Sequence, residues 1–273
     1  MRLVIAAAGV FISVVPAFSD IEAGLDALVR GDAELASSEF QSAFEGGDAD
    51  GAFYLGRMLE LGMGAMSDPA QAAAIYAIAV EQGSTLAANR LGLMYLEGQG
   101  VIRDYRRGAE LLCDAADEGD AAAQFNCGVV HADGKGVAQD DEKALEYWRL
   151  SSEQGNIGAT NLIAIRLKES DPEAAFALFQ QTAAQGNAIG LYEMAVAYET
   201  GNAISADLVE AYGYANLAAS QSHPEAAALR DRLEAEMSAE QVAQGQERTR
   251  AILAEIEAGP APGDEAEPTL ADN

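Results

Sequence analysis

The sequence ANRLGLMYLEGQGVIRDYRRGAELLCDAADEG spans residues 88–119, and FNCGVVHADGKGVAQDDEKALEYWRLSSEQG spans residues 125–155. The two stretches share a pattern of glycine, aspartate and large apolar residues at an offset of 36 residues. The same offset relates Gly47, Gly83, Gly119 and Gly155, then Asp32, Asp68, Asp104 and Asp140, then Gly56, Gly92 and Gly128. A fixed period of this length is typical of a repeat protein in which each repeat is one supersecondary unit.

Each period contains the signals that end one helix and begin the next. A glycine suited to the left-handed position after a helix precedes a side chain that can accept hydrogen bonds from free N–H groups. These capping side chains are Asp48, Ser84, Asp120, Asn156 and Asn187. A second set, from Asp32 to Asp207, begins a second helix in each repeat, and proline follows Asp68 and Asp171 at the first helical position. The spacing predicts helix A, a glycine-containing turn and helix B in each repeat.

The two helices of a repeat carry residues of complementary size. Small residues recur on helix A, at Gly56, Gly92, Gly128, Ala164 and Ala195. Large residues recur on helix B, at Tyr76, Leu112, Trp148 and Phe179. One such hairpin cannot bury its apolar faces alone, so neighbouring hairpins must stack. We therefore predict an all-α fold, a right-handed α–α superhelix (solenoid) of stacked helical hairpins.

The two quoted stretches resemble Sel1-like repeats, a family related to the tetratricopeptide repeats. The resemblance covers residues 32–222, with repeats at 48–83, 84–119, 120–155, 156–186 and 187–222. The fourth repeat departs from the family pattern because it lacks the glycine turn, and the fifth has Ala195 and Ala203 in place of glycine. Family members are α-solenoids that act mainly as adaptors in protein complexes, and many bacterial members are exported. The resemblance implies the same architecture and class of function for this chain.

The two ends of the chain differ from the repeats. Residues 1–19 combine Arg2, an apolar run and small residues before Asp20, which predicts a signal peptide cut after Ser19 and a periplasmic or secreted protein. An uncleaved membrane anchor is the alternative. We expect residues 20–47 to form a divergent N-terminal helical unit and residues 223–258 to form C-terminal capping helices. The first capping helix is predicted from Pro224 to Met237, and the second begins at a capping box of Ser238 and Gln241 and ends at about Ala258. Residues 259–273, GPAPGDEAEPTLADN, are predicted to be a disordered acidic tail.

The net charge of −28, from 44 acidic and 16 basic residues, limits the partners. Nucleic acid and anionic membrane surfaces both require positive charge on the protein, so the composition argues against them. We expect no membrane insertion once the signal is removed. Such acidity favours either a partner with a basic surface or simple solubility.

The sequence holds few candidates for chemistry. Cys113 and Cys127 lie on opposite sides of the turn at Gly119, which predicts a disulfide, with two buried thiols or a redox pair as alternatives. His131 occupies a packing column, and the second histidine, His223, lies before a proline. We therefore expect no metal site and no cofactor. No S-x-x-K, G-x-S-x-G, H-E-x-x-H or P-loop string occurs, so no catalytic residue is assigned and the chain is not expected to be an enzyme.

A groove along the helices A is the candidate binding surface, by similarity to tetratricopeptide arrays, in which these helices line the concave face. Its expected residues are Phe53, Asn89, Phe125, Asn161 and Tyr192, and, one turn further on, Arg57, Leu93, Val129, Ile165 and Val196. Amide side chains can hold a peptide backbone, and apolar side chains can form pockets. The alternative is that part of this stripe forms core between adjacent repeats.

The functional hypothesis is an exported adaptor that binds a protein or peptide partner in this groove and modulates envelope signalling or complex assembly. A cell-wall hydrolase or β-lactam-binding protein is one alternative, although the missing S-x-x-K string argues against it. A host-facing secreted factor is the other.

Overall fold

The computed structural model describes residues 21–259, and between them it is built from helices without a strand. The predicted signal peptide and residues 260–273 of the predicted tail lie outside the described residues. The helices are α1 (Ile21–Val29), α2 (Ala33–Glu45), α3 (Ala49–Leu61), α4 (Pro69–Glu81), α5 (Thr85–Glu97), α6 (Tyr105–Asp117), α7 (Ala121–Asp133), α8 (Asp141–Glu153), α9 (Ile157–Leu167), α10 (Pro172–Ala184), α11 (Ala188–Thr200), α12 (Leu208–Ser220), α13 (Ala226–Glu236) and α14 (Ala239–Ala258). The prediction of an all-α fold is confirmed.

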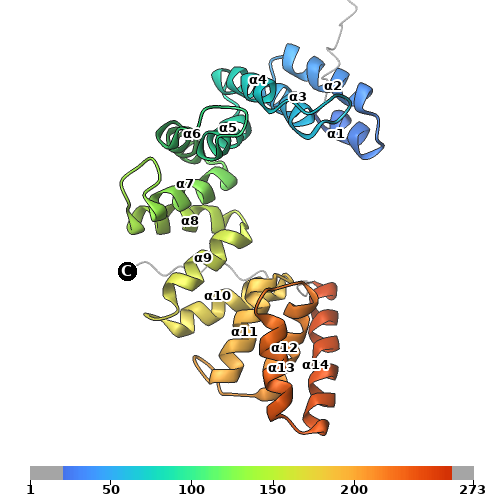
Figure 1. The fold of residues 1–273 in the computed structure, drawn as a ribbon, viewed down its shortest axis with the longest axis vertical. Coiled ribbons are helices and arrows are strands. Elements are labelled where there is room, and N and C mark those ends of the chain that lie inside the picture. Colours follow the sequence, from blue (N-terminus) through green and yellow to red (C-terminus); the bar gives the residue numbers. More distant parts are fainter. Residues whose placement is uncertain (1–20, 260–273) are drawn as a thin grey trace, which may run out of the picture. The chain divides into compact units, whose positions relative to one another are not determined.

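The chain divides into two compact units, unit 1 (Met1–Ala115) and unit 2 (Ala116–Asn273). Within unit 1, α1 packs on α2, and each later helix as far as α5 packs on the one before it (Figure 1). Within unit 2 the same sequential packing connects α7 to α10, α11 and α12, and α12 contacts both α13 and α14. No helix among the described residues is both long and apolar enough to cross a bilayer.

The predicted capping residues begin the helices. The side chains of Asp48, Ser84, Asp120, Asn156 and Asn187 each accept a hydrogen bond from a backbone N–H in the first turn of helix A. The side chains of Asp32, Asp68, Asp140, Asp171 and Asp207 do the same for α2, α4, α8, α10 and α12. Helix boundaries could be predicted because these caps are local in sequence.

The interfaces between helices A and B also match the prediction. A Cβ atom added at Gly56 would lie 2.5 Å from the Tyr76 ring, and one at Gly92 would lie 2.8 Å from Leu112 Cγ. At Gly128 the added atom would lie 2.5 Å from Trp148 Cδ1. The small residue on helix A therefore lets a large residue of helix B fill the interface.

The C-terminal helices differ in one detail from their prediction. Pro224 was expected to begin a helix, but α13 begins at Ala226. Glu225 at the N-cap makes no side-chain hydrogen bond to the helix, since its carboxylate accepts one from the Tyr192 hydroxyl instead. The capping box predicted at Ser238 is present, with Gln241 as its second member.

Ala203 is a position where the repeat has lost its glycine but kept the backbone conformation. Its φ is 66°, in the left-handed region that Gly100 and Gly136 occupy in earlier repeats. This region costs an L-residue about 1–2 kcal/mol, whereas glycine costs about 0.5–1 kcal/mol in extra folding entropy. We expect Ala203→Gly to raise the free energy of unfolding by about 0.5–1 kcal/mol. Hydrogen exchange of α11 and α12 measures this change in the free energy of unfolding. The control is Ala206→Gly in the same loop, where φ is negative, and it should lower stability.

Candidate functional site

The predicted binding residues lie on the helices A of both units. Phe53 and Arg57 lie on α3, Asn89 and Leu93 on α5, Phe125 and Val129 on α7, Asn161 and Ile165 on α9, and Tyr192 and Val196 on α11. Eight of these side chains are partly buried. Ile165 is exposed, at 44%, and Asn161 is buried, at 2%. The column therefore mixes core and surface positions.

The prediction that Asn161 lines a groove is wrong. Its amide nitrogen donates to Asn187 Oδ1 at 2.9 Å, and its Oδ1 accepts from the Thr182 hydroxyl at 2.8 Å. The buried amide thus connects α9 to α10 and to the cap of α11. A side chain whose donor and acceptor are already used inside the protein is not available to a peptide backbone.

Phe125 and Tyr192 belong partly to the core. Phe125 packs against the buried cluster around Trp148, and its carbonyl oxygen accepts from Trp148 Nε1 at 3.2 Å. Tyr192 stacks on His223, with ring centroids 4.2 Å apart, and its hydroxyl donates to Glu225 at 2.8 Å. Burial, followed by this hydrogen bond to a carboxylate, raises the pKa of Tyr192 to about 12. Each side chain thus offers a partner only its exposed edge.

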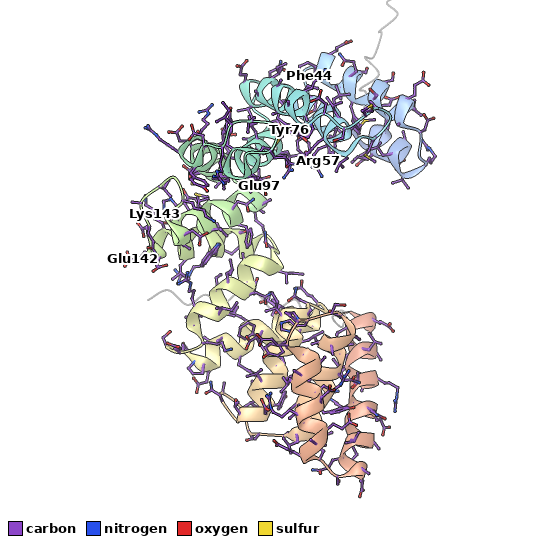
Figure 2. All side chains as sticks on the ribbon, in the orientation of Figure 1. Phe44, Arg57, Tyr76, Glu97, Glu142 and Lys143 are labelled. Carbon is purple, nitrogen blue, oxygen red and sulfur yellow. The ribbon has the colours of Figure 1, made fainter. Side chains whose placement is uncertain are left out.

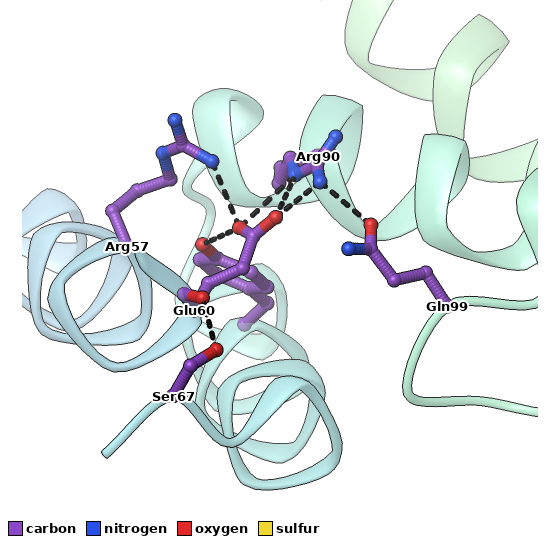
Figure 3. Close-up of polar contacts among 6 residues, drawn as sticks. Arg57, Glu60, Ser67, Arg90 and Gln99 are labelled. Carbon is purple, nitrogen blue, oxygen red and sulfur yellow. Dashed lines mark hydrogen bonds and ion pairs between the residues drawn. The ribbon is translucent and has the colours of Figure 1, made fainter. Parts of the chain in front are cut away.

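In unit 1, one buried carboxylate binds side chains of three neighbouring helices (Figure 3). Glu60, at the end of α3, is 8% exposed. It accepts from Arg57 Nη1 at 2.8 Å, from the Tyr76 hydroxyl at 2.7 Å and from Arg90 Nε at 3.0 Å. Arg90 also donates to Gln99 at 2.9 Å. The cluster joins α3, α4 and α5, and Figure 2 places Arg57 and Tyr76 on neighbouring helices of this unit.

The cluster shifts the ionisation of its members. Burial alone would raise the pKa of Glu60, but hydrogen bonds from Arg90, Tyr76 and Arg57 outweigh it and lower that pKa to about 2. Hydrogen bonds to the charged form of a carboxyl group favour ionisation. Glu60 therefore stays a carboxylate at neutral pH and holds the Arg57 and Arg90 side chains in fixed positions.

Sequence reasoning missed Glu60 and Arg90. The signal was present, because Glu60 occupies a column in which the next repeats have Leu96 and Ala132. An acidic residue at a position that is apolar in the next two repeats indicates a buried carboxylate that needs a partner. The partner could not be named, because Arg90 lies 30 residues further along the chain.

An open groove between α2, α3 and α4 was also missed. Its lining includes Met58, which is buried, Met63, which is 39% exposed, and the acidic Glu34. The next repeats have the polar residues Gln99 and Lys135 at the position of Met63. The sequence therefore showed an apolar residue in a turn that is polar in the other repeats. The groove adds exposed apolar surface to unit 1 beyond the predicted binding residues.

The cysteines are oxidised in the structure. Cys113 and Cys127 are each disulfide-bonded, and the chain has no other cysteine. The disulfide predicted from their positions on either side of Gly119 is confirmed. The alternative of two buried thiols does not describe this state.

Comparison with known families matches the Sel1 repeat at residues 49–84, 85–120, 121–156, 167–187 and 188–223, more than half of the chain. The chain belongs to the Sel1 repeat family. The fourth match covers only the second half of its repeat. This is the repeat that lacks the glycine turn. No curated protein matches this Sel1 repeat protein in sequence.

Two solved structures share the fold of this Sel1 repeat protein. A Sel1 repeat protein from Oxalobacter formigenes is 23% identical with a TM-score of 0.72, over 85% of this chain and 99% of that one. The protective antigen c5321 of uropathogenic Escherichia coli, described as displaying an SLR fold, is 24% identical with a TM-score of 0.71. That match covers 86% of this chain and 54% of the E. coli protein, so this chain spans about half of its length. Both likenesses confirm the predicted α-solenoid.

Proposed function

We propose that this Sel1 repeat protein is an exported adaptor that binds a protein or peptide partner through the faces of its helices A. Sel1 repeat proteins are generally scaffolds for protein–protein interaction. In unit 2 the supporting observation is the mixed character of these faces. Ile165 is exposed at 44%, while Val129 and Tyr192 are partly buried and held by packing. Side chains fixed in this way bind with a small loss of conformational entropy.

Unit 1 supports the same proposal with a polar surface. The Arg57 side chain is 34% exposed and the Arg90 side chain 22% exposed, and both are held by Glu60. Arginine is enriched in the energetically dominant positions of protein interfaces. An arginine that is already ordered has less entropy to lose when a partner binds.

Two features of the chain support export and the chemistry of the partner. A disulfide persists in oxidising compartments, such as the periplasm or the extracellular space, and is rare in a reducing cytosol. The net charge of −28 favours a basic surface on the partner, which would face the acidic residues of the chain rather than Arg57 and Arg90. Association with such a partner weakens as salt rises, because the Debye length falls.

The proposal predicts that a photo-crosslinking residue at Ile165 on α9 forms an adduct with one partner in the producing cells. The matched control is Leu150 on α8, which is exposed to a similar extent, 40% against 44%, but lies on a helix B. We expect an adduct from position 165 and none from position 150, identified by mass spectrometry of the exported fraction. Equal adducts from both positions, or an adduct from position 150 alone, would show that the faces of the helices A do not bind the partner.

A further inference from the structure

His131, near the end of α7, carries a buried nitrogen that its surroundings do not satisfy. The residue is 9% exposed, and its ring stacks on Tyr147 with centroids 5.9 Å apart. Its Nδ1 atom has no hydrogen-bond partner among the described residues. An unsatisfied buried polar group destabilises the folded state. Packing does not require this cost, because the same column holds Leu59 and Tyr95 in other repeats.

Cys127 lies one helical turn before His131 on the same face of α7, since residues four apart are neighbours on a helix. Its side chain is fully buried. The Cys127 sulfur and a ring nitrogen of His131 lie within 4.8 Å of each other. A zinc ion lies about 2.3 Å from a thiolate sulfur and about 2.0–2.1 Å from an imidazole nitrogen. The two ligand atoms are therefore close to the separation that one shared cation needs.

We propose that Cys127 and His131 form a thiol-gated site for a soft d10 cation, Zn²⁺ or Cu⁺. The site is closed in the oxidised chain, because a disulfide sulfur carries no thiolate charge to donate to a metal. Thiolate and imidazole are the donors that select these two cations. Water completes the coordination of zinc. Both proposed ligands lie on α7.

The gate opens by thiol–disulfide exchange with a dithiol reductant. A thiolate of the dithiol attacks the disulfide, the protein S–S bond breaks, and the dithiol closes its own disulfide. Two electrons pass from the dithiol to the protein, and the two protons of the dithiol balance the two thiols formed. Cys127 then loses its proton to solvent as it binds the cation, and the unpartnered Nδ1 of His131 becomes the second ligand.

The sequence did not predict this site, because its two members were interpreted separately. Cys127 was assigned to a disulfide and His131 to a packing column, and a count of two histidines argued against zinc. The unsatisfied Nδ1 is visible only in the structure.

The test titrates Zn²⁺, and separately Cu⁺, into the purified full chain against a chromogenic chelator. We expect one equivalent bound after reduction with a phosphine and none by the oxidised chain. The Cys113→Ser variant frees the Cys127 thiol without a reductant, and it should bind one equivalent if circular dichroism shows native helicity. Adding His131→Phe, which keeps an aromatic ring in the column, should weaken binding at least tenfold. The Zn²⁺ and Cu⁺ arms identify which cation the site prefers.

Two outcomes would overturn the site. One is equal metal binding by the oxidised and reduced chains. The other is equal affinity of the Cys113→Ser variant with and without His131→Phe. The melting temperature of oxidised His131→Phe provides an independent measurement, which we expect to be unchanged or raised, because the substitution removes an unsatisfied polar atom. A lowered melting temperature would show that packing requires the imidazole, against the premise.

Discussion

Replacing Glu60 by leucine should lower the free energy of unfolding of α3–α5 by about 2–3 kcal/mol. Leucine occupies the same column in the next repeat, at Leu96, so the substitution matches the repeat pattern and still destabilises. The reason is that Arg90 and the Tyr76 hydroxyl lose their acceptor, and Tyr76 is 0% exposed. Removing one partner of a buried ion pair costs about 3–5 kcal/mol. Solvent reaches Arg57 and Arg90 in part, which reduces that cost.

Hydrogen-exchange mass spectrometry measures the effect where it arises, with peptides from α11 and α12 as an internal control. Tyr76→Phe added to Glu60→Leu should recover part of the loss, since it removes the orphaned hydroxyl. A coupling free energy of about 1 kcal/mol between positions 60 and 76 is expected from the double-mutant cycle. Additive effects would show that the hydrogen bond between them contributes nothing.

The contribution of Glu60 depends on pH in a defined direction. Its pKa is lowered from 4.5 to about 2 in the folded chain, because hydrogen bonds from the two arginines and Tyr76 outweigh the effect of burial. A lowered pKa gives stability that is fully present above the unfolded value and is lost as pH falls through the folded value. The difference in stability between the native chain and Glu60→Gln should therefore shrink from pH 4.5 towards pH 2. A difference that is constant over this range would show that the carboxylate is not stabilised.

The sequence predicted the parts of the fold that are encoded locally. Caps such as Asp48 and Ser84 act within their own turn, so each helix start could be inferred from a few residues. The pairing of small residues on helix A with large residues on helix B could also be predicted, because Gly128 and Trp148 each recur as similar residues in other repeats. The start of α13 was misplaced because Glu225 bonds to Tyr192 rather than capping its helix.

The binding surface could be predicted only in part, because periodicity does not show which polar groups find partners. Asn161 lies in the predicted binding column, yet its amide is used by Asn187 and Thr182. Glu60 and Arg90 meet across two helices, and the next two repeats have neither residue at the equivalent positions. Residues that depart from the repeat are therefore the ones that sequence columns predict least well.

Gly128→Ala should destabilise unit 2 by about 2–3 kcal/mol, although alanine is the better helix former by about 1 kcal/mol. The added Cβ would lie 2.5 Å from Trp148 Cδ1 and 3.0 Å from the Ala144 carbonyl oxygen. Trp148 is 2% exposed and donates to the Phe125 carbonyl, so its ring cannot move without losing that bond and its packing. Overpacking a core in this way costs about 1–3 kcal/mol, and the lost hydrogen bond about 1 kcal/mol more.

The fourth repeat supplies the matched control for this prediction. There the corresponding pair is Ala164 and Phe179, which pack in one buried cluster. Trp148→Phe added to Gly128→Ala should therefore recover at least half of the loss, measured by hydrogen exchange of α7 and α8. A Gly128→Ala variant more stable than the native chain would mean that helix propensity outweighs the contact with Trp148. Rescue by the smaller ring would instead show that the size of the helix B residue determines which residue fits opposite it on helix A. The pair of small and large residues would then set the distance between the two helices of each repeat.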